Sequence, residues 1–193
     1  MTAILETKQL FTLEEYLRME EHATEKHTFE NGKIKIMPGG TANHNEISAN
    51  AITALSNAVR QLALKFRVFS SDMKIRIPYN NKVLYPDALV IAENPEFYEA
   101  RKDIITNPLL IVEVISPSSE AGDRGSKFHD YRTITTFKEY LLLWQDEAFA
   151  TLATRQSNDL WRMTDIQGLD QHIQLESIGC TINMADLYFN IEF

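Results

Sequence analysis

Hydrophobic residues recur with helical spacing in two stretches of the N-terminal half. Thr12 followed by Glu15 has the form of a capping box at the head of an apolar stripe, which predicts a short helix over about residues 12–21. Between residues 43 and 65 apolar positions recur every three or four residues without proline or glycine, which predicts a long amphipathic helix packed on a sheet. The positions of this second stripe are Ile47, Ala51, Leu55, Ala58 and Leu62.

Strand-like patterns occupy most of the remaining chain. Strict alternation over residues 33–37 follows the Asn31-Gly32 dipeptide, which suits a tight hairpin turn. Apolar runs of strand length, several rich in β-branched residues, are separated by turn residues, and two further short helices are expected over 123–133 and 183–188. The further predicted strands are 67–70, 73–78, 84–92, 109–115, 140–144, 149–154, 160–164 and 171–175.

The length and composition fit one globular domain. We expect residues 1–193 to form a single mixed α/β (α+β) unit with a central sheet flanked by helices. The single cysteine, Cys180, cannot form an internal disulfide and is expected to be a small buried residue. Neither a secretory signal pattern nor a stretch long enough to span a bilayer is present, so we expect a cytoplasmic protein with no membrane partner.

The charge of the chain is acidic on average and unevenly distributed. A net charge of -8 argues against an obligate nucleic-acid binder, which normally needs a basic face. The segment 60–82 nevertheless holds six basic residues against Asp72 alone. These basic residues are Arg60, Lys65, Arg67, Lys74, Arg76 and Lys82.

Two carboxylates interrupt otherwise apolar strands. Asp87 stands in the run 84–92 and Glu113 in the run 109–115. A buried carboxylate is unfavourable by several kcal/mol unless it is paired, hydrogen-bonded or bound to a metal. Two such ligands on neighbouring strands suit Mg²⁺ or Mn²⁺, which would polarise a phosphodiester and activate a water. Taken singly, each acid could equally cap a helix or pair with an arginine.

Lys127 is the candidate that turns this pair of acids into a catalytic site. If the loop 116–122 folds the following helix back across the strand end, the ammonium can orient the water and stabilise negative charge on phosphorus. Tyr131, four positions on, shares the helix face of Lys127 and is an accessory candidate. His44 and Glu30 are further accessory candidates, although a surface or capping role explains each of them as well.

The segments 85–90 and 108–119, followed by Asp123, Lys127 and Tyr131, resemble the Uma-two family of restriction endonucleases. The segments 11–17, 29–34 and 44–47 are similar to that family's N-terminal segments, so the resemblance covers nearly the whole chain.

The resemblance implies a restriction endonuclease-like fold with a site of the PD-(D/E)XK type. Asp87 would be the first acid, Glu113 the second, and the main-chain carbonyl of Val114 a further metal ligand. The lysine of the usual Glu-x-Lys is replaced by Ile115, and Lys127 is the natural substitute.

Two functions follow from these residues. The first is a metal-dependent endonuclease that acts on DNA, for which a homodimer would supply the two sites that duplex cleavage needs. The second is a catalytically inactive nuclease-fold module that binds nucleic acid or protein, which the acidic charge and the displaced lysine favour. The two are separated by whether Asp87, Glu113 and Lys127 meet at one surface.

Overall fold

A mixed six-stranded sheet forms the centre of the computed structural model, which describes residues 10–117, 119–157 and 160–193. Ser118, in the segment that carries the family resemblance, lies outside the described residues. The strand order is β11-β10-β9-β8-β6-β3, and only the β8–β9 pair is parallel. The strands are β3 (Phe66–Ser70), β6 (Ala88–Ala92), β8 (Leu110–Ile115), β9 (Glu139–Trp144), β10 (Phe149–Arg155) and β11 (Trp161–Gln167).

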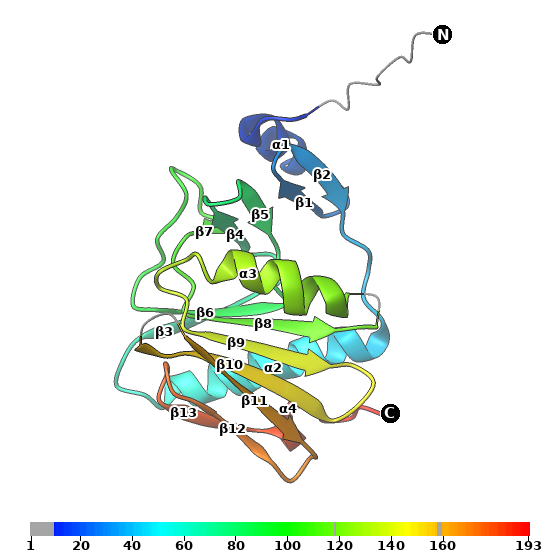
Figure 1. Cartoon of the computed structure of the whole chain (residues 1–193), viewed down its shortest axis with the longest axis vertical. Helices are drawn as coiled ribbons and strands as arrows, with labels where there is room; N and C mark the ends of the chain where they lie inside the picture. The colour runs from blue at the N-terminus through cyan, green and yellow to red at the C-terminus, as the bar shows by residue number, and fades with distance from the viewer. Residues whose placement is uncertain (1–9, 118, 158–159) are drawn as a thin grey trace.

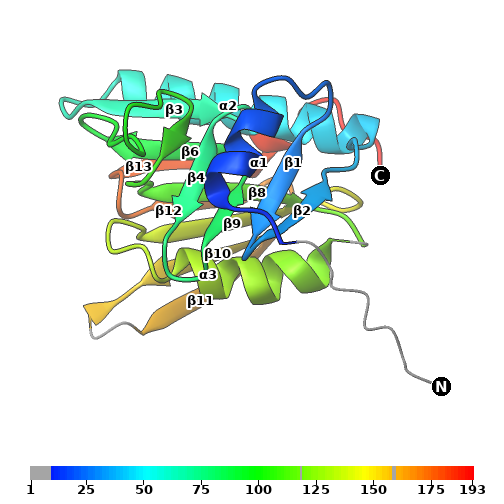
Figure 2. The ribbon, with the colours of Figure 1, turned by 90° about the horizontal axis from the view of Figure 1, so that it is seen from above.

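Helices lie on both faces of this sheet, as Figures 1 and 2 show. The long helix α2 (Ala42–Arg60) covers one face, and the opposite face carries a helical segment made of η1 (Gly122–Lys127), which is π-helical, and α3 (Phe128–Tyr131). Side chains that alternate along β8 therefore enter two different cores, with Val112 and Val114 on the α2 side and Ile111 and Ile115 on the α3 side. Both faces of the strand are buried, which accounts for its nearly continuous apolar sequence.

A second sheet packs beside the first and carries the N-terminal helix. Its strand order is β2-β1-β5-β4-β7, and α1 (Leu13–Glu20) covers it with a small core around Tyr16 and Phe29. The strands are β1 (His27–Glu30), β2 (Lys33–Ile36), β4 (Lys74–Ile77), β5 (Lys82–Leu84) and β7 (Ile104–Ile105).

A C-terminal hairpin completes the layer on the α2 side. It consists of β12 (His172–Leu175) and β13 (Cys180–Asn183), followed by α4 (Met184–Leu187). Cys180, expected to be buried, is only partly buried on β13. No helix in the described part of the chain is long and apolar enough to cross a membrane.

Local sequence signals located several elements correctly. Thr12 and Glu15 form the expected capping box at the start of α1. Asn31 and Gly32 adopt φ values of 47° and 84°, the left-handed conformation that a tight hairpin turn between β1 and β2 requires. The mixed sheet with helices on both faces agrees with the predicted fold class.

The predicted strand over residues 84–92 was wrong, because the structure divides it between two sheets. β5 ends at Leu84 and β6 begins at Ala88, so that Asp87 stands just before a strand rather than inside one. Pro86 has no N–H to give to a ladder and restrains the residue before it, which favours a break at this point. The break places the Asp87 carboxylate at the start of β6, an inner strand of the central sheet, beside Val114 of β8.

The end of one helix and the presence of two strands also differ from the predictions. The predicted helix over 43–65 ends at Arg60, because the chain has to leave the helix axis to enter β3 and pair with β6. β7 and β13 were not predicted. β7 has only two residues, too few for any periodicity to register.

Candidate active site

Glu113 is the fourth residue of β8 and is buried between Ile111 and Ile115 of the α3-side core. Its side chain is 4% exposed. The Tyr131 hydroxyl donates to Glu113 Oε1 over 3.0 Å, and the Lys127 ammonium donates to Oε2 over 3.0 Å. Both carboxylate oxygens are thus engaged by side chains of the helical segment that crosses the strand, as the loop-and-helix prediction required.

Asp87 is tied to the same strand through its carboxylate. Asp87 Oδ2 accepts a hydrogen bond of 2.7 Å from the main-chain N–H of Val114, the residue after Glu113. The pairing of Ala88 with Val112 sets this arrangement, because it brings the start of β6 beside the second half of β8. The two acids predicted from the sequence therefore share one end of neighbouring antiparallel strands.

His44 contacts the same carboxylate from the helix α2. It lies in the first turn of α2, and its Nε2 is 3.5 Å from Asp87 Oδ2. The His44 and Asp87 side chains are 22% and 15% exposed, so both are partly open to solvent.

Asp123 is a further member of the cluster, and it was not predicted from the sequence to be a site residue. Its Oδ1 lies 2.7 Å from Lys127 Nζ, and Asp123 precedes the lysine by four residues. Asp123, Lys127 and Tyr131 are spaced four residues apart and share a face. The same spacing argument that selected Tyr131 would have found Asp123.

Lys127 ends the π-helical segment η1, a local widening that often accompanies functional residues.

The charges of the cluster shift one another's pKa values. Burial raises the pKa of Glu113 to about 8; the Lys127 ammonium opposes this rise, and the Asp87 and Asp123 carboxylates add to it. Burial also raises the pKa of Asp87, with His44 acting in the opposite direction. Burial disfavours the Lys127 ammonium, yet the Glu113 and Asp123 carboxylates hold its pKa above the usual value. Three carboxylates around one ammonium form a site that additional positive charge would stabilise.

The donor set agrees with a cation that retains water ligands. Among the described residues, no group of three or more histidine, cysteine, aspartate or glutamate side chains forms a ready-made metal cage. Mg²⁺ commonly needs only one or two carboxylates, with water and substrate oxygens completing its shell. Asp87 and Glu113 carry oxygen donors of this kind, and burial raises the pKa of both acids.

Ile115 and Glu30 take up structural positions. Ile115 is 1% exposed and packs in the core on the same side of β8 as Glu113, so a lysine there would have pointed toward the cluster. Lys127 brings an ammonium to that side from the helical segment instead. The Glu30 carboxylate lies 2.9 Å from Lys35 and 3.9 Å from Lys82, and these described contacts place it with the second sheet.

The basic segment 60–82 is not a continuous basic surface. Lys74 pairs with Asp103 over 2.7 Å, and Lys82 pairs with Asp130 over 2.6 Å. The Arg76 guanidinium donates to main-chain carbonyls and to a side-chain amide. Half of the basic residues that the sequence places together are therefore neutralised or bound within the fold.

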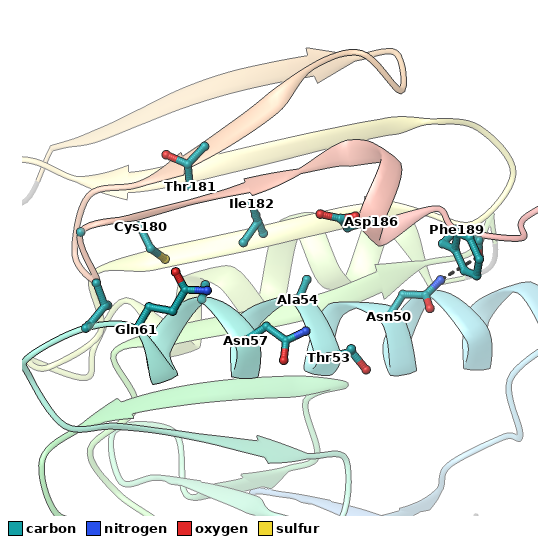
Figure 3. A pocket seen from close by; sticks show the side chains of 13 residues that line it. Asn50, Thr53, Ala54, Asn57, Gln61, Cys180, Thr181, Ile182, Asp186 and Phe189 are labelled. Carbon is teal, nitrogen blue, oxygen red and sulfur yellow. Dashed lines mark hydrogen bonds between the residues drawn. The ribbon is translucent and has the colours of Figure 1, made fainter.

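A groove of about 530 Å³ lies away from this cluster, between α2 and the C-terminal elements β13 and α4 (Figure 3). Asn57 of α2 and Gln61, which follows that helix, line it opposite Cys180 and Asp186. It contains none of the predicted site residues. The acid cluster lies between the inner strands β6 and β8 and the helical segment, and this groove is a separate feature.

Comparisons with known proteins agree with the geometry. Residues 13–185 match the model of the Uma2 family, described as "Putative restriction endonuclease". Two uncharacterized proteins of Synechocystis sp. are 35% and 33% identical to this chain, covering 89% and 93% of it and 96% and 92% of their own lengths. A crystal structure described as a "putative nuclease belonging to DUF820" from Anabaena variabilis has a TM-score of 0.73 at 17% identity, covering 92% of this chain and 97% of its own. At that identity the likeness establishes the fold.

Proposed function

The chain belongs to the Uma2 family, and from this premise we propose that it is a metal-dependent endonuclease that hydrolyses phosphodiester bonds in DNA. The observation that carries the proposal is the contact of Lys127 with Glu113 at 3.0 Å, beside an Asp87 carboxylate bound to the next residue of the same strand. Family descriptions that name a restriction endonuclease and a nuclease support the reaction class.

In this proposal the acids form the metal site. Asp87, Glu113 and the main-chain carbonyl of Val114 would hold Mg²⁺ or Mn²⁺. When bound, the ion would polarise the phosphodiester and make a water molecule more acidic. Tyr131 fixes the orientation of the Glu113 carboxylate by donating to one of its oxygens. The carboxylate would therefore already be oriented before substrate binds.

Lys127 has the role of charge stabiliser in the proposed site. Its pKa is held above the usual value by Glu113 and Asp123, so it remains an ammonium at neutral pH rather than acting as a general base. A fixed positive charge at this point would stabilise the extra negative charge that develops on the phosphate oxygens as water attacks. Asp123 holds the ammonium from its other side at 2.7 Å.

A specific observation also favours a second candidate. Ile115 occupies the position of the usual lysine, and the chain carries a net charge of -8. A catalytically inactive module that retains the fold and binds nucleic acid or protein would have both features. The enzyme remains the first candidate because an ammonium reaches Glu113 from the helical segment. A homodimer would present two such sites to the two strands of a duplex.

Cleavage of mixed single- and double-stranded DNA distinguishes these candidates. Purified protein is assayed with Mg²⁺, Mn²⁺ or EDTA, beside Asp87→Ala and the control Asp72→Ala, whose carboxylate is 84% exposed in a surface ion pair. The proposal expects metal-dependent cleavage that Asp87→Ala lowers at least about 100-fold and Asp72→Ala leaves unchanged. Equal cleavage by all three proteins would indicate a contaminant, and no cleavage under any condition would favour the binding module.

A further inference from the structure

Gly40 stands immediately before Thr41, the N-cap residue of α2. The glycines with a left-handed backbone are Gly32, Gly168 and Gly179, and Gly40 is not among them. A residue of any type could therefore adopt its backbone conformation. The reason for a glycine at this position has to lie in its surroundings.

The imidazole of His44 occupies the space that a side chain at position 40 would need. A Cβ atom on Gly40 would lie 2.7 Å from His44 Nδ1 and 2.9 Å from Cγ. Carbon atoms in favourable contact are about 3.5 to 4.0 Å apart. Even an alanine would therefore force either the main chain or the imidazole to move.

The main chain around Gly40 is fastened at several points. The Asn45 side-chain amide donates to the Gly40 carbonyl over 3.1 Å and to the Thr41 carbonyl over 2.9 Å. The Thr41 hydroxyl accepts from the His44 main-chain N–H over 3.2 Å and donates to Gln145 Oε1 over 2.9 Å. With the loop held by the helix and by the end of β9, the mobile partner is the imidazole ring.

The opposite edge of that ring faces the proposed active site. His44 Nε2 is 3.5 Å from Asp87 Oδ2, and the side chain is partly open to solvent. We infer that Gly40 is a positioning residue, whose missing side chain lets the His44 imidazole stand against the Asp87 carboxylate. The functional consequence rests on the proposed nuclease function, in which Asp87, the neighbour of His44, holds the metal, whereas the positional relation can be tested without it.

The chain offers a matched control in the neighbouring glycine. A Cβ atom on Gly39 would have nothing within 4 Å, although Gly39 belongs to the same exposed loop and also lacks a left-handed backbone. Gly40→Ala and Gly39→Ala thus apply the same substitution to adjacent residues, and only the first is expected to displace His44. Thermal unfolding of both variants verifies that they fold.

NMR of the imidazole ring nitrogens tests the positional relation directly. The chain has five histidines, and the His44 signals are identified by their loss in His44→Gln. We expect Gly40→Ala to shift the His44 signals at constant pH, and Gly39→Ala to leave them in place. Unchanged His44 signals in Gly40→Ala, or equal shifts in both variants, would overturn the inference.

A double-mutant cycle on DNA cleavage tests the functional consequence. We expect Gly40→Ala to lower kcat at least about ten-fold, because small misplacements of site residues have large effects on rate. Gly39→Ala should stay within about two-fold of wild type. In a His44→Ala background, Gly40→Ala should cause no additional loss; an equal additional loss there would refute the positioning role. Absence of cleavage by the wild type would overturn the proposed function, and the NMR experiment would still decide the inference.

Discussion

At the scale of single residues, the central feature of the candidate site is a carboxylate inside a buried strand. Glu113 is surrounded by apolar neighbours on β8 and is compensated by Lys127 and Tyr131. A glutamate in such a place is unfavourable unless its partners or a cation offset the loss of water. Lys127 and Tyr131 are these partners. The acids Asp87, Glu113 and Asp123 outnumber the single Lys127 ammonium, so a cation would lower the electrostatic repulsion among them.

Glu113 should make the metal-free protein less stable as pH rises from about 5 to 8. Its pKa is about 8 in the folded protein, against 4.5 for an ordinary glutamate, so in this window the folded state holds a proton that the unfolded chain has lost. The contribution of Glu113 to the free energy of unfolding is therefore complete below about pH 4.5 and is lost as the pH rises through about 8.

Denaturant unfolding in EDTA at several pH values measures this effect. Glu113→Gln should flatten the pH dependence, because the amide does not titrate. Glu120→Gln is the control, since the Glu120 side chain is 43% exposed and should leave the curve unchanged. A wild-type curve that rises between pH 5 and 8, or that Glu113→Gln leaves unaltered, would contradict the assignment.

The sequence allowed the prediction of part of this cluster. Asp87 and Glu113 were found because acids interrupt apolar runs, and Lys127 was found because the loop 116–122 could fold the following helix back across the strand end. Asp123 was given no role, although its spacing of four residues from Lys127 carries the signal. The proximity of Gly40 to His44 has no sequence signature, because it depends on how a loop packs against the first turn of α2.

At the scale of secondary structure, a helical segment replaces a strand as the source of the ammonium. Ile115 points to the same side of β8 as Glu113 but belongs to the apolar core. The chain after β8 turns back so that the helical segment of η1 and α3 runs alongside the strand, as Figure 1 shows, and Lys127 of this segment donates to Glu113. The position of this segment is consequently as important to the site as the strands.

A buried ion pair ties that segment to the second sheet. Lys82 of β5 is 2.6 Å from Asp130 of α3, and the Asp130 side chain is 2% exposed. Lys82→Met would leave the aspartate buried without its main counter-charge, and we expect a loss of about 3 kcal/mol in the free energy of unfolding. Lys35→Met, which removes the exposed partner of Glu30, should cause a loss below about 1 kcal/mol. Equal losses in urea unfolding would contradict this account.

Elements with strong local signals were predicted, and elements set by tertiary contacts were not. The capping box of α1 and the Asn31-Gly32 turn are encoded in a few adjacent residues. The end of α2 at Arg60 depends on the pairing of β3 with β6, and β7 exists because Ile104 and Ile105 lie beside β4. Pro86 is a sequence signal for the break between β5 and β6, but the apolar residues on both sides led to the prediction of one continuous strand.

At the scale of the whole molecule, the charge distribution is unusual for the proposed action on DNA. The net charge is -8, and Lys74, Arg76 and Lys82 are engaged within the fold. Phosphate groups approaching the acid cluster would meet negative charge. A divalent cation at the site would reverse that local repulsion, so substrate binding and metal binding should be coupled.

DNA affinity should therefore depend on a divalent cation even when no cleavage takes place. Ca²⁺ is the probe, because it takes the same oxygen ligands as Mg²⁺. Fluorescence anisotropy with a labelled duplex should give an affinity at least about ten-fold higher in Ca²⁺ than in EDTA, and Asp87→Asn should abolish the difference. Equal affinities in Ca²⁺ and EDTA for the wild type would show that the acid cluster lies away from the DNA-binding surface.

The most direct test of the central claim is the rate of Mg²⁺-dependent DNA cleavage by Lys127→Met, compared with Arg124→Met. Both residues belong to η1, but Arg124 is exposed and pairs with Glu120, whereas Lys127 contacts Glu113. If Lys127 has taken the place of the missing strand lysine, its substitution lowers the rate at least about 100-fold and Arg124→Met retains wild-type activity. Undiminished metal-dependent cleavage by Lys127→Met would contradict the account.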